Sequence, residues 1–134
     1  MPKAIPDGYN TVSPYLAVDG AEQAIAFYEK AFGAKERGRM DGPDGKIAHA
    51  ELQIGDSVVM LSDPFPQAST KTPKELGGTS VNIFIYVEDT DAAYKQAVDA
   101  GATSLMEPDD MFWGDRFSSV QDPFGHTWTI ATHI

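Results

Sequence analysis

The sequence predicts an α+β fold in which two similar βαβββ modules form one domain, residues 1–134. The stretches VSPYLAVDGAEQAIAFYEKAFGA (12–34) and SVNIFIYVEDTDAAYKQAVDAGA (80–102) share one pattern. In each, an alternating run ends in Val, an acidic residue follows, and a helical stretch closes with Gly-Ala. Three further strand candidates follow each helix. An internal repeat of this kind is typical of a duplicated supersecondary unit.

The first module begins with an alternating strand over residues 11–18. Asp19 is predicted to be the N-cap of the next helix, and Gly33 is predicted to end it. The apolar stripe of this helix has helical spacing and consists of Ala24, Ile25, Tyr28 and Phe32. The turn sequences GPDG and GD separate the strands expected at 36–40, 47–54 and 57–62.

The second module repeats this order. Its first strand places apolar side chains on one face, Asp89 is predicted to cap the helix, and Gly101 is predicted to end it. Further strands are expected at 103–106, 116–121 and 127–132, with DPFG as the last turn. The stretch 64–79 is rich in Pro, Gly, Ser and Thr and is expected to be a linker. Module one then spans about 9–63 and module two about 80–134.

Strand periodicity predicts a cup between the two modules. The helix of each module must cover the aliphatic face of its sheet, because that face needs burial. The opposite face of the two first strands then carries Ser13, Tyr15, Ala17, Asn82, Phe84 and Tyr86. We therefore expect an eight-stranded, cup-like open barrel with its helices on the outside.

Hairpin register extends the predicted lining of the cup. A two-residue turn at 55–56 pairs Glu51 with Met60 and His49 with Ser62. A four-residue loop at 122–125 pairs Ser118 with Thr129 and Arg116 with Ala131. The side chains of His49, Glu51, Arg116 and Ser118 are therefore all predicted to point inward, and a slip of one residue would reverse each prediction.

The strand–helix junction VDGAEQAIAFY and the final DPFGH, set in two βαβββ modules, resemble the vicinal oxygen chelate superfamily. That group includes glyoxalase I, extradiol dioxygenases, fosfomycin-modifying enzymes and bleomycin resistance proteins. The stretches HAELQIGDSVVMLSD and FWGDR further resemble its PhnB-like branch. The resemblance implies a small-molecule ligand and a homodimer, in which the two sheets of one cup come from one chain or from two.

Metal-using members of the superfamily resemble one another in placing His, Glu or Gln at four positions of the first and last strands. The matching positions here are Ser13, Met60, Asn82 and Thr129, and the members of each module pair lie 69 residues apart. These side chains lack the imidazole and carboxylate groups that divalent cations prefer. We therefore expect no cofactor, and a divalent metal enters only in the alternative in which His49 and Glu51 form a relocated site.

His49 and Glu51 are the acid–base pair predicted inside the cup, and they could serve as a catalytic dyad. The alternative is structural: His49 bonds to Ser62, and Glu51 neutralises Arg116. Arg116 could itself hold a carboxylate or phosphate of a ligand, or pair with Asp115 or Glu51. The side chains of Ser118 and the aromatic residues are predicted to contact a ligand; the aromatic set is Tyr15, Phe84, Tyr86, Phe112 and Trp113.

Composition limits the partners. The formal net charge is −10 and the sequence pI is about 4.5, which argues against nucleic acid and anionic membranes as partners. There is no Cys, so thiolate chemistry and disulfides are excluded. No apolar run has the length of a membrane span or the character of a signal peptide, and a cytoplasmic location is expected.

Three functions are compatible with these features. The favoured one is a metal-free binding protein of the glyoxalase/bleomycin-resistance type that sequesters a flat or cationic ligand between aromatic walls. The alternative is a lyase, isomerase or dioxygenase of the superfamily that uses His49 and Glu51, with or without a metal. The third is a structural or regulatory dimer whose cup no longer binds anything.

Overall fold

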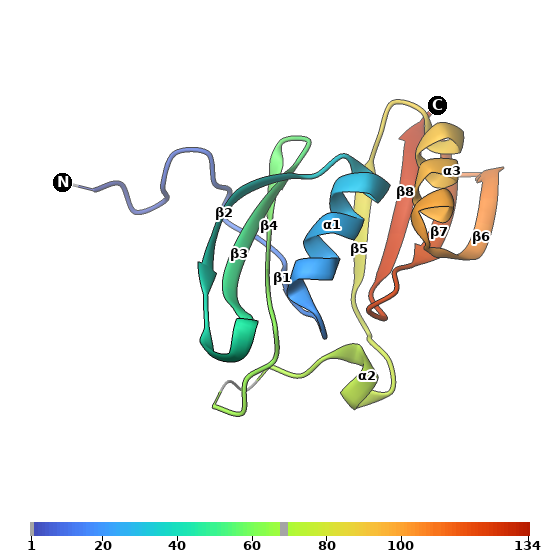
Figure 1. Ribbon diagram of the computed structural model, residues 1–134. Coiled ribbons are helices and arrows are strands. Elements are labelled where there is room, and N and C mark those ends of the chain that lie inside the picture. Colours follow the sequence, from blue (N-terminus) through green and yellow to red (C-terminus); the bar gives the residue numbers. More distant parts are fainter. Residues whose placement is uncertain (1, 68–69) are drawn as a thin grey trace.

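A computed structural model describes residues 2–67 and 70–134, and its strands form two four-stranded mixed sheets (Figure 1). Sheet A has the order β1-β4-β3-β2, with β1 at Tyr15–Ala17, β2 at Lys35–Asp41, β3 at Ile47–Ile54 and β4 at Ser57–Ser62. Sheet B has the order β5-β8-β7-β6, with β5 at Asn82–Tyr86, β6 at Thr103–Asp110, β7 at Asp115–Gln121 and β8 at Thr127–His133. The helices are α1 (Ala21–Phe32), α2 (Pro73–Leu76) and α3 (Thr90–Ala100), and η1 (Pro43–Gly45) is a 3-10 turn. Two βαβββ modules in an α+β fold are thereby confirmed.

In each module the first strand runs parallel to the last, and the other neighbouring strands are antiparallel. The two sheets remain separate and do not close into a barrel, which fits the expected open, cup-like arrangement. The stretch expected to be a linker contains α2, whose N-cap Thr72 and residue Glu75 form a reciprocal capping box. No helix in residues 2–67 and 70–134 is long and apolar enough to cross a membrane.

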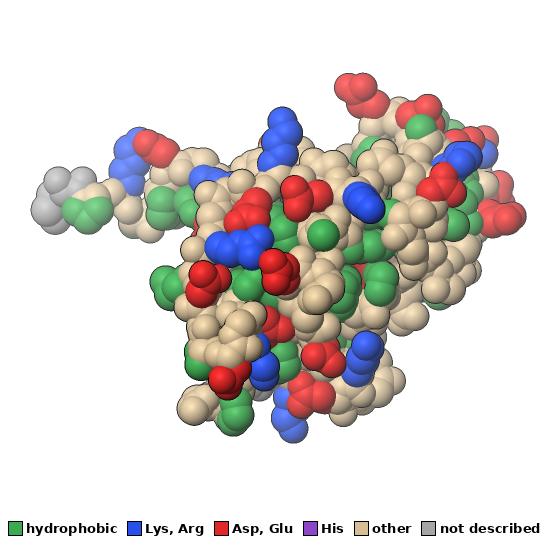
Figure 2. Space-filling view, viewed as in Figure 1, with side chains coloured by type: hydrophobic (Ala, Val, Ile, Leu, Met, Phe, Trp, Pro, Cys, Tyr) green, Lys and Arg blue, Asp and Glu red, His purple; other side chains and the backbone are tan. Residues whose placement is uncertain are grey.

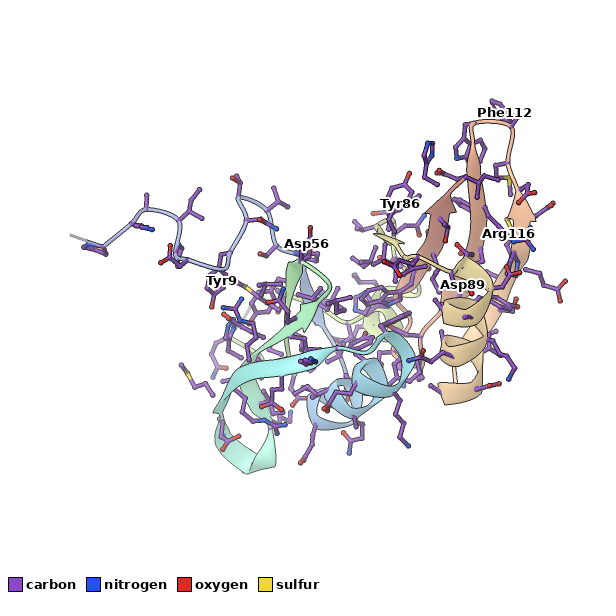
Figure 3. All side chains as sticks on the ribbon, turned by 90° about the horizontal axis from the view of Figure 1, so that it is seen from above. Tyr9, Asp56, Tyr86, Asp89, Phe112 and Arg116 are labelled. Atoms are coloured by element: carbon purple, nitrogen blue, oxygen red, sulfur yellow. The ribbon has the colours of Figure 1, made fainter. Side chains whose placement is uncertain are left out.

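Helices α1 and α3 contact each other and lie on the same side of the two sheets (Figures 1 and 3). We call the side of each sheet that they cover its helix face, and the opposite side its open face. α1 serves both modules, since the Tyr28 and Phe32 rings pack on Trp128 of β8 with centroids 5.3 and 4.4 Å apart. Residues of both modules thus share one buried core. The outer surface on the helix side carries many charged side chains of both signs (Figure 2).

The carboxylate that caps α1 comes from a distant strand end. The N-cap is Gly20, at φ 102°, and not Asp19 as predicted; Asp19 is exposed. Buried Asp63, directly after β4, accepts hydrogen bonds from the backbone N–H of Gly20 and Ala21 at 3.0 and 2.9 Å. Its other oxygen accepts the N–H of Ile47 at 2.8 Å. In module two, Asp89 caps α3 with its own side chain, as predicted.

A five-residue loop joins β7 to β8, one residue longer than predicted. Asp122 N–H donates to the His126 carbonyl, and the Asp122 carboxylate accepts the N–H groups of Phe124 and His126. His126 therefore belongs to the loop, and Gln121 pairs with Thr127 across it. The predicted pairs Ser118–Thr129 and Arg116–Ala131 are wrong, because Ser118 pairs with Ile130 and Arg116 with Thr132. This shift of one residue reverses the faces predicted for both β7 side chains.

The second oxygen of Asp122 links the modules. It accepts the Tyr28 hydroxyl of α1 and the indole N–H of Trp128, the latter at 2.9 Å. All three side chains are buried, and desolvation together with the nearby Asp122 carboxylate raises the pKa of Tyr28 well above its usual value. The His126 ring adds a second link, with its Nε2 2.9 Å from the Ala17 carbonyl of β1.

Replacing Asp63 by Ala should destabilise the chain by about 2–3 kcal/mol, because α1 loses its cap and buried N–H groups lose a charged acceptor. Asp19→Ala is the matched control and should change the free energy of unfolding by less than about 0.5 kcal/mol, since Asp19 is exposed. Urea unfolding of the three proteins measures both values. Equal losses for the two variants would contradict the assignment of Asp63 as the cap.

Candidate functional site

The open face of sheet A carries a continuous chain of four polar side chains. The Tyr15 hydroxyl lies 2.9 Å from His49 Nδ1, and His49 Nε2 lies 2.9 Å from Glu51 Oε2. The other carboxylate oxygen of Glu51 accepts the Tyr9 hydroxyl. Since an ionised carboxylate only accepts, His49 donates from Nε2, and in the neutral ring with this tautomer Nδ1 accepts the Tyr15 proton. The chain of hydrogen bonds therefore has one consistent direction.

Strand register brings three members of this chain together. Met60 of β4 pairs with Tyr15 of β1 on one side. On its other side it pairs with Glu51 of β3, as the two-residue GD turn predicted. His49 lies two residues before Glu51 and so shares its face. The structural alternatives considered for the pair are not observed, because His49 contacts Tyr15 and Glu51 rather than Ser62, and Arg116 is bound elsewhere.

Tyr9, which the sequence did not indicate, reaches this face from the segment before β1 (Figure 3). Arg37 of β2 holds that segment: its guanidinium lies 4.5 Å from the centroid of the Tyr9 ring and donates to the Gly8 carbonyl at 3.1 Å. A hollow of about 540 Å³ lies beneath the segment, and its lining includes Tyr9, Ser13, Glu51 and Met60. Tyr9 thus forms part of the wall of a cavity that also exposes Glu51.

The hydrogen bonds of this chain lower the pKa of Glu51. The bond from His49 is the largest cause and the bond from Tyr9 the second, while partial burial opposes both. The same bond to Glu51 raises the pKa of the Tyr9 hydroxyl. Glu51 is therefore held as a carboxylate, which can neutralise a positive charge beside it.

The open face of sheet B is aromatic. The Phe84 and Tyr86 rings of β5 lie 4.9 Å apart between centroids, and the Phe117 ring of β7 lies 6.1 Å from Phe84 and 5.7 Å from Trp113. Three of these residues keep much of their surface in water: Phe84 is 47% exposed, Trp113 50% and Tyr86 62%. Phe112, at the tip of the β6–β7 hairpin, is almost fully exposed (Figure 3). The predicted aromatic residues of β5 thus lie on the open face, with Phe117 as an addition.

A second hollow, of about 690 Å³, runs along the free edge of β5. Its lining includes Phe84, Tyr86, Phe32 and Asp56 of the β3–β4 turn. This volume lies within the range usual for sites that bind small organic molecules.

Arg116 and Ser118 do not lie on the open face, contrary to the prediction. Arg116 donates to the two carboxylate oxygens of Asp91 on α3 at 2.8 and 3.2 Å, and to Asp110 at 3.0 Å (Figure 3). Ser118 is fully buried and donates to the Ile130 carbonyl at 3.0 Å. Neither side chain is available to a ligand on the open face, because the longer β7–β8 loop turned both of them toward the helix.

The four positions that correspond to the superfamily's metal ligands do not suit a divalent cation. Ser13, Asn82 and Thr129 offer only neutral oxygen or nitrogen donors, and Met60 offers a soft thioether. Thr129 is also buried in β8. Within residues 2–67 and 70–134, no three His, Asp or Glu side chains are grouped so that they could hold a metal ion. We therefore derive no chemistry from a metal at these positions.

Replacing Tyr9 by Phe, or His49 by Ala, should raise the pKa of Glu51 toward its ordinary value, since each removes a hydrogen bond to the carboxylate. A pKa that is depressed in the folded chain stabilises the fold at neutral pH, and this contribution is lost as the pH falls through the folded-state pKa. NMR titration of the carboxyl carbon measures the shift. Glu36, whose pKa Arg39 lowers at a separate position, is the internal control and should not move. An unchanged Glu51 titration in both variants would refute the hydrogen-bonded chain.

Known proteins share the sequence pattern and the fold of this chain. The uncharacterised protein Mb0911c of Mycobacterium bovis is 50% identical over 126 residues, which cover 92% of this chain and 83% of that protein. The structure of the At5g48480 product of Arabidopsis thaliana has a TM-score of 0.74 at 29% identity and covers 92% of this chain and 98% of its own. A PhnB protein of Bacillus cereus shares the fold alone, with a TM-score of 0.66 at 18% identity over 92% of this chain and 99% of its own. Residues 9–130 match the glyoxalase/bleomycin resistance protein/dioxygenase superfamily, and the chain belongs to that superfamily.

Proposed function

We propose that this protein binds a flat organic molecule, neutral or cationic, on the aromatic open face of sheet B. The observation that carries the proposal is the set of half-exposed rings of Phe84, Tyr86 and Trp113 on one sheet face. Rings left in water on a regular sheet offer stacking and cation–π contacts to a ligand. The adjoining hollow of about 690 Å³ provides room for it.

The charges near the open face of sheet B favour a neutral or cationic ligand over an anion. Arg116, the cation that the sequence placed inside, is bound to Asp91 and Asp110 on the other side of sheet B. The open face of sheet B instead carries the carboxylate of Asp115, whose hydrogen-bond donors lower its pKa. On sheet A, the carboxylate of Glu51 is partly balanced by the nearby guanidinium of Arg37. We further propose that the chain belongs to the PhnB-like branch. The Bacillus cereus PhnB protein supports this by its similar fold alone.

A second copy of the chain completes the cup in this proposal. Helices α1 and α3 both lie on one side of the sheets, so neither of them covers the two open faces (Figures 1 and 3). Tyr15 on sheet A and Phe84 on sheet B are each about half exposed. Sheet A of one copy facing sheet B of the other would enclose a ligand between the polar chain and the aromatic rings.

The full chain should therefore behave as a dimer of about 29 kDa, twice the 14.5 kDa of one chain. Light scattering coupled to size-exclusion chromatography measures the mass. A mass near 14.5 kDa at micromolar concentration would exclude a cup shared between copies.

Planar aromatic cations should quench the fluorescence of Trp113 in a saturable way. The chain has two Trp residues, and Trp128 is fully buried in the core, so Trp113 is the accessible reporter. With proflavine as the probe, Tyr86→Ala and Phe84→Ala should each raise the Kd about five- to tenfold, the loss of roughly 1 kcal/mol of stacking. Tyr94→Ala, which removes an aromatic ring from α3, is the matched control and should leave the Kd unchanged.

The same titration tests charge and metal dependence. Anthraquinone-2-sulfonate, a planar anion, should bind more weakly than proflavine. Protein treated with a chelator should bind proflavine as well as protein supplied with Zn²⁺, Ni²⁺, Mn²⁺ or Fe²⁺. A loss of binding on chelation, or a Kd that neither aromatic substitution changes, would argue against the proposal.

An enzyme of the superfamily is the second candidate, and the chain Tyr15–His49–Glu51–Tyr9 favours it. A His held between a carboxylate and a phenol is the arrangement of a positioned general base. Turnover of a bound compound that is lost in His49→Ala, with ligand binding retained, would support the enzyme over a binding protein.

A further inference from the structure

The buried carboxylate of Asp115 connects two aromatic residues of the open face of sheet B, Tyr86 and Trp113. Asp115, the first residue of β7, is only 3% exposed. One of its oxygens accepts the Tyr86 hydroxyl at 2.9 Å and the Trp113 indole N–H at 3.1 Å, and the other lies 3.1 Å from His133 Nδ1. Two rings of the proposed binding face and one imidazole thus share a single carboxylate.

The backbone fixes the pairing of Asp115 with His133. The two residues are direct partners in the β7–β8 ladder, and Ile134 N–H donates to the Gly114 carbonyl at 2.9 Å. Gly114 has φ +96°, which favours glycine, and a Cβ at this position would lie 3.5 Å from the His133 ring. The sequence FWGDR therefore supplies both the glycine of the turn, Gly114, and the residue that pairs with His133, Asp115.

The hydrogen bonds also determine which nitrogen of His133 binds Asp115. The groups that donate hydrogen bonds to Asp115 lower its pKa, and His133 is the largest contributor. The Asp115 carboxylate is therefore ionised and can only accept hydrogen bonds. His133 then donates from Nδ1, and in the neutral ring with this tautomer Nε2 is an acceptor. The His133 side chain is 77% exposed, so this nitrogen is accessible to a ligand.

We propose that His133 and Asp115 form an acid–base dyad that takes the proton of a phenol-like hydroxyl on an aromatic ligand of this face. The O–H bond of the ligand breaks, its electron pair stays on the oxygen, and the proton moves to His133 Nε2. The ligand enters as the neutral phenol, and its proton stays in the site on the imidazolium, which lies between the Asp115 carboxylate and the phenolate, so that the complex gains no net charge. This inference rests on the proposed function and names its ligand class: planar aromatic compounds with a weakly acidic hydroxyl at the edge.

Two probes that differ only at the hydroxyl test the dyad. 4-Nitrophenol has the acidic proton and its anion absorbs visible light, whereas 4-nitroanisole has a methyl ether in its place. At a pH where free 4-nitrophenol is mostly protonated, the wild-type protein should bind it as the coloured anion and prefer it to 4-nitroanisole. His133→Ala should lose the colour and reduce that preference about tenfold, while its affinity for 4-nitroanisole stays unchanged.

Asp115→Asn supplies a second variant, because it keeps the size of the side chain but cannot balance an imidazolium. Provided that its thermal unfolding shows a folded chain, it should bind both probes without ionising 4-nitrophenol. If it does not fold, the His133→Ala comparison alone decides the proposal.

The possible failures are distinguishable. If both probes bind and the preference is the same with and without the His133 imidazole, the dyad is refuted and the aromatic binding face stands. If proflavine binds but neither nitro compound does, the ligand class assigned to the dyad is wrong. If no planar probe binds at all, the proposed function fails together with this inference.

Discussion

The carboxylate of Asp122 is the contact on which the arrangement of the two modules depends. It binds the Tyr28 hydroxyl of α1 and the Trp128 indole of β8 in the buried core. This contact holds the helix of the first module against the sheet of the second. Both helices therefore lie on one side, and both open faces remain on the other. The DPFGH sequence thus has a physical role in this chain, since its Asp shapes the last loop and also joins the modules.

The two open faces differ in chemistry. Sheet A presents a directed chain of hydrogen bonds that ends in the carboxylate of Glu51, and sheet B presents rings with a carboxylate buried behind them. One face is suited to exchanging protons or attracting positive charge, and the other to stacking. The four positions that correspond to the superfamily's metal ligands hold Ser13, Met60, Asn82 and Thr129, and none of these is an imidazole or a carboxylate.

Much of this could be predicted from the sequence, because strand and helix periods are local properties. The period of two and the two-residue GD turn placed Tyr15, His49 and Glu51 on one face correctly. Arg116 and Ser118 were misplaced because the length of the last loop depends on hydrogen bonds to the Asp122 side chain. Tyr9 lies in an irregular segment without a period, and its partner Glu51 is 42 residues away. Asp115 and His133 were missed for a similar reason, since only the register of β7 with β8 brings them together.

Helices α1 and α3 differ in which residue accepts the hydrogen bonds of their first turn, and the two modules are unequal in this respect. α3 carries its own cap in Asp89, one residue ahead of the helix. The N-cap of α1 is a glycine, which has no side chain to accept a hydrogen bond. The first N–H groups of α1 instead donate to the carboxylate of Asp63, which lies 42 residues after Ala21 in the chain. A ribosome must therefore synthesise residue 63 before α1 gains this acceptor, whereas α3 has its cap within its own segment. During synthesis the later half is the more self-sufficient of the two.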